Sequence, residues 1–84
     1  MDLVIRSQRK IIPIEMKSGP TGKLRSLHEY MDRCEHHYAI RMYKGKWQID
    51  DVKTSRGKMY KLLSIPYFLG SRLAEIAELF VLGH

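Results

Sequence analysis

Three ionisable residues near the N-terminus, Asp2, Glu15 and Lys17, are of types that could hold a metal ion with a cation beside it. Asp2 precedes a short apolar run, and Glu15 and Lys17 end a second run that begins at Ile11. Paired carboxylates bind Mg²⁺ or Mn²⁺, which prefer oxygen ligands. The metal acidifies a bound water and stabilises charge on a phosphate, and a nearby lysine orients the water or neutralises the oxyanion. Hydrolysis of a nucleic-acid phosphodiester is the reaction that uses all three groups.

The two apolar runs must pair as strands for these residues to meet. A short polar break separates them, so the pattern predicts a β-hairpin over residues 2–17. If this break is the loop, Arg6 faces Ile11, and the same register puts Asp2 opposite Glu15. Residues that face each other in this way have Cβ atoms about 4.5–5.5 Å apart. We therefore expect the two carboxylates to share one patch of the sheet.

Side chains alternate along a strand, so Lys17 emerges on the same face as Glu15. Pro13 cannot donate a hydrogen bond, which predicts a weakened or unpaired stretch around it. The alternative interpretation is a solvated hairpin face with an ordinary Glu15–Lys17 ion pair, worth under about 1 kcal/mol. The opposite face of the second run is the predicted core side and carries Ile12, Ile14 and Met16.

Length and composition indicate one small domain over residues 1–84. The formal net charge of +6 makes polyanions such as nucleic acid plausible partners, although general solubility explains it equally well. A single cysteine, Cys34, excludes an internal disulfide framework and fits a reducing cytosol. No apolar run is long enough to span a membrane, and Asp2 stands where a signal peptide would be basic. We expect a cytoplasmic protein with no membrane partner.

The remaining pattern predicts an α/β fold with a small mixed sheet of three to five strands flanked by helices. A turn follows Lys17, and apolar residues at helical spacing predict a helix over about 23–35. Alternating runs predict strands within about 37–65, including one at 37–43, a short one near 47–49 and one at 59–65. A helix over about 67–82 closes the chain.

Five segments of the chain carry a resemblance to a known family: Asp2-Leu-Val-Ile, Ile11-Ile-Pro-Ile-Glu-Met-Lys-Ser-Gly19, Leu24-Arg-Ser-Leu-His28, Tyr38-Ala-Ile-Arg41 and Ile65-Pro-Tyr-Phe-Leu69. They resemble the PD-(D/E)xK nuclease superfamily, in particular the nuclease-like C-terminal domain of prokaryotic AAA+ ATPases. The similarity covers Asp2 to about Leu69, and its specific part is the Ile-Glu-x-Lys-Ser-Gly hairpin with an upstream Asp.

The resemblance implies a reduced restriction-endonuclease-like fold and a Mg²⁺ or Mn²⁺ cofactor. By that comparison Asp2 and Glu15 match the metal carboxylates, and Lys17 matches the catalytic lysine. The main-chain carbonyl of Met16 matches a further metal ligand.

The chain also departs from the family pattern. Members usually have a helix and a strand before the aspartate, whereas this chain has one residue, Met1, before Asp2. The Gly-rich phosphate-binding loop of the ATPase module does not occur in the sequence. We therefore expect the C-terminal piece of a longer ATPase-type protein, or a short reading frame derived from one.

Basic residues interleaved with Tyr43, Trp47 and Tyr60 predict a nucleic-acid-binding surface, on which the bases stack on the aromatic rings. The alternative is that these aromatic residues are core or sheet-face residues among solvated charges. The predicted nucleic-acid-binding residues are Lys23, Arg41, Lys44, Lys46, Arg56 and Lys58.

Two further patterns leave alternatives open. His28, Cys34, His36 and His37 are metal-ligand types, but they lack paired zinc-ligand spacing and fit surface imidazoles at a helix end. The apolar stripe of the last helix, over 69–82, fits a core. It also fits a homodimer interface or a contact with the missing ATPase module.

Overall fold

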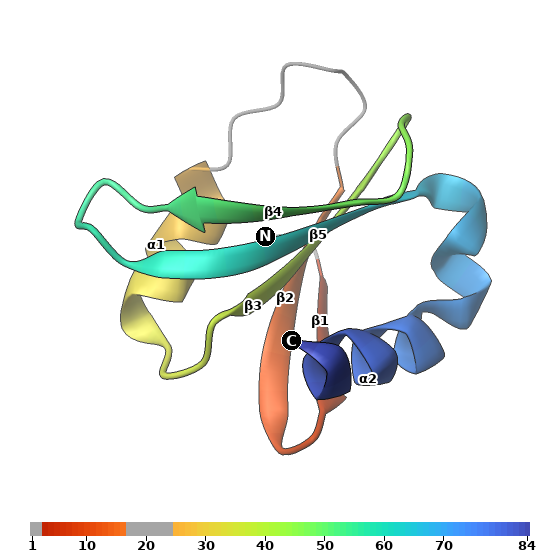
Figure 1. Ribbon diagram of the computed structural model, residues 1–84, viewed down its shortest axis with the longest axis horizontal. Coiled ribbons are helices and arrows are strands. Elements are labelled where there is room, and N and C mark those ends of the chain that lie inside the picture. The colour runs from red at the N-terminus through yellow and green to blue at the C-terminus, as the bar shows by residue number, and fades with distance from the viewer. Residues whose placement is uncertain (1–2, 17–24) are drawn as a thin grey trace.

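The described residues form a five-stranded mixed sheet with one α-helix on each face, which confirms the predicted fold class (Figure 1). The computed structural model describes residues 3–16 and 25–84. The sheet order is β1-β2-β3-β5-β4. Strands β2, β3 and β5 are parallel, and the two edge strands are antiparallel to their neighbours. The strands are β1 (Leu3–Ser7), β2 (Lys10–Met16), β3 (Tyr38–Tyr43), β4 (Gln48–Lys53) and β5 (Met59–Pro66).

The predicted hairpin register is confirmed for the described pairs. Arg6 pairs with Ile11, and the register runs from Ser7↔Lys10 to Leu3↔Ile14. The turn consists of Gln8 and Arg9, which both have positive φ, as a two-residue hairpin turn of type I′ requires. Asp2 and Lys17 lie outside the described residues, so the predicted pairing of Asp2 with Glu15 stays a prediction.

Pro13 explains why β2 pairs with β1 and with β3 along different parts of its length. β2 pairs with β1 along Lys10–Ile14, but its ladder with β3 covers Ile14–Met16. Pro13 has no N–H to donate toward β3, so the ladder begins only after it. The crossover from β2 to β3 contains α1 (Arg25–Arg33), as a parallel pair requires.

The two helices cover opposite faces of the sheet because side chains alternate along each strand. On one face, α1 places Leu27 and Met31 against Ala39, Tyr60 and Leu62. The other face holds the larger core, beneath α2 (Leu73–Gly83) (Figure 1). That core contains Ile12, Ile14, Ile40, Met42, Leu63 and Ile65 from the strands and Ile76, Ala77, Phe80 and Val81 from α2.

The structure corrects several predicted boundaries. The last helix does not begin at 67: a 3₁₀ helix, η1 (Tyr67–Arg72), comes first, and α2 starts at Leu73. β4 reaches Lys53, because the polar residues after Ile49 pair with β5. Within the described part of the first helix, α1 ends at Arg33 rather than 35.

The predicted faces of β2 also need correction. Met16 is exposed rather than core, because it lies at the strand end, whereas Pro13 and Glu15 on the other face are buried.

Candidate functional site

Four polar side chains form one continuous row across four adjacent strands. Glu15 of β2 is in register with Arg41 of β3, Arg41 with Ser64 of β5, and Ser64 with Gln48 of β4. We call these four residues the polar row. They lie on the same sheet face as α1, near the carboxyl ends of the three parallel strands. Open α/β sheets bind ligands at this edge.

The polar row interrupts strands that are otherwise apolar. Each parallel strand contributes one polar residue between two apolar ones, in Ile14-Glu-Met16, Ile40-Arg-Met42 and Leu63-Ser-Ile65. The neighbouring apolar residues turn to the opposite face, where the buried ones among them join the core beneath α2. The next row on the α1 side contains Ala39 and Leu62, which pack under α1. The polar row therefore begins where the apolar core under α1 ends.

Two members of the polar row are buried. Glu15 is 6% exposed and Ser64 is fully buried at 0%. Removing a carboxylate from water is strongly unfavourable unless charges or hydrogen bonds compensate it. A carboxylate at this position is therefore a specialised feature rather than part of a solvated hairpin face.

Arg41 is half-buried in the middle of the polar row and is held from two sides. Its Nε donates a hydrogen bond to Ser64 Oγ at 3.1 Å. Its guanidinium carbon lies 4.6 Å from the centroid of the Tyr43 ring, which is a cation–π contact. The Tyr43 hydroxyl donates to the Lys46 carbonyl at 2.8 Å. A side chain at Gly45 would collide with the Tyr43 ring. The β3–β4 connection thus fixes Tyr43, and Tyr43 supports Arg41.

The β4 end of the polar row is also ordered by hydrogen bonds. Gln48 donates from Nε2 to both carboxylate oxygens of Asp50, at 2.8 and 2.9 Å. Asp50 pairs with Leu62 and so points to the same sheet face as Gln48. Asp50 was not among the residues that the sequence singled out.

The predicted metal site is only partly described. Glu15 and Met16 lie at the end of β2, and Met16 turns its exposed side chain to the face opposite Glu15. Asp2, Lys17 and Lys23 fall outside the described residues. Within residues 3–16 and 25–84, no group of three His, Cys, Asp or Glu side chains is placed to hold a metal ion. Of the two carboxylates predicted to bind the metal, Glu15 is the one that the structure describes, so a mutation of Glu15 is the natural test of the metal site.

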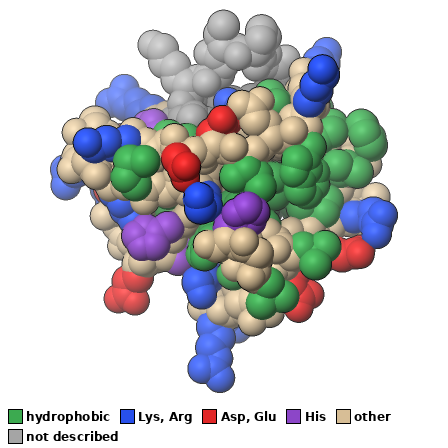
Figure 2. Space-filling view, viewed as in Figure 1, with side chains coloured by type: hydrophobic (Ala, Val, Ile, Leu, Met, Phe, Trp, Pro, Cys, Tyr) green, Lys and Arg blue, Asp and Glu red, His purple; other side chains and the backbone are tan. Residues whose placement is uncertain are grey.

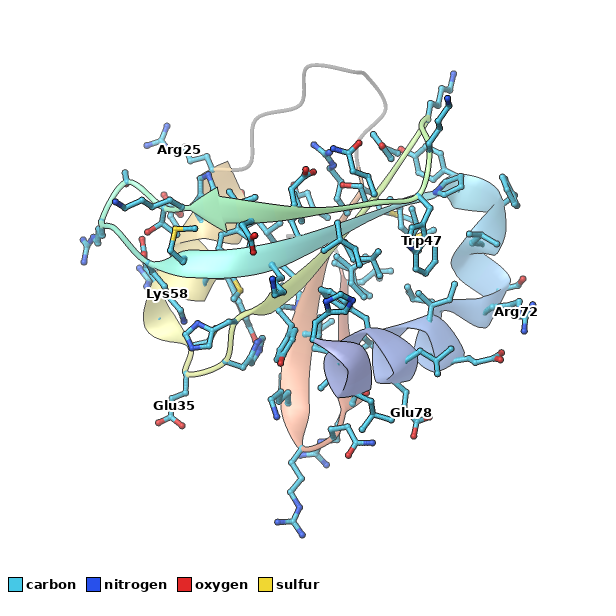
Figure 3. All side chains as sticks on the ribbon, in the orientation of Figure 1. Arg25, Glu35, Trp47, Lys58, Arg72 and Glu78 are labelled. Carbon is cyan, nitrogen blue, oxygen red and sulfur yellow. The ribbon has the colours of Figure 1, made fainter. Side chains whose placement is uncertain are left out.

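The predicted nucleic-acid-binding residues do not form one stripe. Arg41 belongs to the polar row, and Lys44 and Lys46 follow β3 at the same end of the sheet. Arg56 and Lys58 lie in the β4–β5 turn, before β5 begins, and therefore at the opposite end. The ammonium of Lys58 donates to the Cys34 carbonyl, so it helps to hold the end of α1 (Figure 3).

The aromatic side chains are mainly structural. Tyr60 is 2% exposed, and its hydroxyl hydrogen-bonds with His28 Nδ1 at 2.9 Å. Burial, only partly offset by Arg41, raises the pKa of Tyr60 to about 12. Trp47 is exposed, but it lines a shallow groove with residues of η1 and α2, on the other side of the sheet (Figure 3). Bases cannot stack on the Tyr60 ring, because this ring is buried.

The histidines also serve the fold. His36 accepts a hydrogen bond from the Tyr38 N–H at Nδ1, 3.1 Å, and its Nε2 lies 2.7 Å from the Ile11 carbonyl. His37 Nδ1 lies 3.2 Å from the Met59 carbonyl. These contacts connect the segment after α1 to β2, β3 and β5 near the amino ends of the parallel strands. Among the described residues they do not assemble a zinc site with Cys34.

Sequence reasoning missed the polar row because its members are far apart in the chain. The usable signal was a single polar residue between two apolar ones in each of three strands. Only the register shows that these three positions are aligned.

No protein-family model matches the sequence, and no curated protein or solved structure shows significant similarity to the chain. None of the described helices is long and apolar enough to cross a membrane.

Proposed function

We propose that this chain is a PD-(D/E)xK-like domain that hydrolyses nucleic-acid phosphodiesters with the help of Mg²⁺ or Mn²⁺. The observation that carries the proposal is the buried carboxylate of Glu15, set beside Arg41 at the carboxyl ends of parallel strands. The hairpin register supports it, because the predicted pairing of Asp2 with Glu15 depends on that register. A cytoplasmic location is part of the same proposal, because nucleic acid is found there.

Each residue has a distinct role in this proposal. Glu15, together with Asp2 and the Met16 carbonyl, would hold the metal, which would supply an activated water and stabilise charge on the phosphate. Lys17 would orient that water or neutralise the oxyanion. This domain would be the C-terminal part of an AAA+ ATPase-type protein.

Metal binding tests the proposal most directly. We expect calorimetric titration to detect one Mn²⁺ site in the wild type, and Glu15→Gln to weaken it at least tenfold, because the amide lacks the ligand's charge. Glu29→Gln is the matched control, since Glu29 is an exposed carboxylate on α1 paired with Arg25. We expect the wild type and Glu29→Gln to nick plasmid DNA in Mg²⁺, and Glu15→Gln to lose this activity.

The wild type and both variants must first show the same circular-dichroism spectrum. Equal Mn²⁺ affinity of the wild type and Glu15→Gln, or a wild type that binds no Mn²⁺, would contradict the metal-dependent reaction.

A second candidate is a nucleic-acid-binding module without catalysis. It is favoured by the position of Arg41, Lys44 and Lys46 at one end of the sheet and by the formal net charge of +6. Binding of DNA with the same affinity in Mg²⁺ and in EDTA, with no nicking, would support this candidate against the first.

Self-association through the last two helices is a third property to test. Figure 2 shows hydrophobic side chains gathered over the side of the molecule where η1 and α2 lie. Phe68, Leu79 and Leu82 are 80%, 64% and 65% exposed. The partner would be a second copy of the chain or an ATPase module in the same protein.

A further inference from the structure

We propose that Arg41 binds a phosphate of the nucleic-acid backbone at the polar row, and that Ser64 is the residue that positions it. This inference rests on the proposed function, because it assigns the substrate contact of the same site. It adds a phosphate-binding residue that the metal carboxylates and the lysine do not supply.

The charge of Arg41 points to an anionic ligand. None of the ion pairs between described residues includes Arg41. A half-buried guanidinium is stabilised by an anion, and its planar group matches two oxygens of a phosphate. Arg41 is in register with Glu15, so a phosphate bound by Arg41 would lie beside the proposed metal.

The surroundings of Arg41 fix its orientation before any ligand binds. Ser64 accepts the hydrogen bond from Nε, and the Tyr43 ring lies under the guanidinium. Gly45 and the Lys46 carbonyl hold that ring in place. A side chain that is already ordered loses less conformational entropy on binding. Ser64 therefore acts through Arg41 and does not itself need to touch the ligand.

The aromatic residues favour backbone recognition over base recognition. Tyr43 is occupied by Arg41 and Gly45, and Tyr60 is buried. Trp47 lies with η1 and α2, away from the polar row. Contacts to phosphates carry no sequence information. We therefore expect binding that is independent of sequence and strongly dependent on salt.

The test measures the affinity of a short fluorescent DNA duplex by anisotropy over a series of salt concentrations, in Ca²⁺ and in EDTA. We expect Arg41→Gln to weaken DNA binding about tenfold or more. The plot of log K against log salt should also become shallower, by about one unit of slope, because one phosphate contact is lost. Arg72→Gln removes the same charge from an exposed arginine that pairs with Glu75 on the α2 side, and should change neither quantity (Figure 3).

Two conservative variants test the geometry. Arg41→Lys keeps the charge and should keep the salt slope, but the affinity should fall because a lysine cannot bind two oxygens at once. Ser64→Ala should weaken binding a few-fold through Arg41, with an unchanged salt slope, and Ser64→Thr should restore affinity.

The outcomes separate this inference from the proposed function. If the wild type binds Mn²⁺ and the duplex but Arg41→Gln binds the duplex as well as Arg72→Gln does, the phosphate contact is wrong and the metal site stands. If Mn²⁺ binding is absent while Arg41→Gln still weakens binding of the duplex and reduces its salt dependence, the phosphate contact stands without hydrolysis. Should Arg41→Gln fail to fold, Arg41→Lys and Ser64→Ala decide: wild-type affinity in both would overturn the proposal.

Discussion

Two main-chain groups that hydrogen-bond to the His36 ring determine its protonation state. The Tyr38 N–H donates to Nδ1, so the ring proton must be on Nε2, which donates to the Ile11 carbonyl. The Tyr30 hydroxyl donates to the same carbonyl at 3.0 Å. These bonds hold the part of β2 before Pro13, where the ladder with β3 is absent. A single neutral imidazole thus replaces part of a strand ladder.

This arrangement predicts a loss of stability in acid. Burial lowers the pKa of His36 below 6.5, and Lys58, Lys10 and His37 lower it further, against the hydrogen bond to Ile11. The unfolded chain therefore binds the proton first, so the free energy of unfolding falls as pH drops from about 6.5 toward the folded-state pKa. Thermal melts between neutral and mildly acidic pH should show this decrease.

His36→Gln isolates this contribution from that of the carboxylates. The variant cannot titrate, so its melting temperature should depend less on pH than that of the wild type over the same range. Parallel pH profiles for the two proteins would show that His36 does not cause the acid sensitivity.

At the scale of elements, the β1–β2 turn adopts a conformation that its residues disfavour. Gln8 and Arg9 have φ of 51° and 67°, in the left-handed region. For residues other than glycine this conformation costs roughly 1–2 kcal/mol each. The hairpin tolerates it because the primed turn matches the twist of the strands and because the register is fixed by the buried Ile12 and Ile14.

Replacement of Arg9 by glycine should relieve this cost. We expect Arg9→Gly to raise the free energy of unfolding by about 0.5–1 kcal/mol, after the entropy lost by glycine on folding is subtracted. Gly57→Ala is the opposite control, because Gly57 has φ of 96° in the β4–β5 turn and alanine there is strained. Urea unfolding measures both; a destabilised Arg9→Gly would show that the arginine side chain contributes more than the backbone strain.

At the scale of the whole molecule, the two faces of the sheet differ in how their helices use apolar residues. α1 buries Leu27 and Met31. α2 buries Ile76, Ala77, Phe80 and Val81 but still exposes Leu79 and Leu82, and Phe68 of η1 is exposed as well. Exposed apolar patches of this kind commonly mark interaction surfaces.

Sedimentation tests this surface. We expect the wild type to form dimers in a concentration-dependent way and Leu79→Glu to shift it toward monomer, because a charge would be buried in the contact. Lys53→Glu changes the charge of an exposed residue at the far end of β4 and should leave the association unchanged. A wild type that is monomeric at all concentrations would remove self-association and leave the ATPase module as the proposed partner.

The sequence by itself determined the local elements of this protein. Alternation and a polar break predicted the hairpin and its register through Arg6↔Ile11, and helical spacing predicted the buried stripes at Leu27 and Phe80. These features depend on residues close together in the chain, so period and turn chemistry suffice. The start of α2 at Leu73 was missed because a 3₁₀ segment and an α-helix share similar spacing.

Only the tertiary structure decided which residues meet at the candidate site. Glu15, Arg41 and Ser64 are separated by more than twenty residues at each step, and a shift of one residue in either ladder would turn Arg41 or Ser64 to the other face. That register is set by packing of the apolar residues on both faces of the sheet, which no local pattern contains. The tertiary structure likewise buried Tyr60 and separated Lys44 from Lys58.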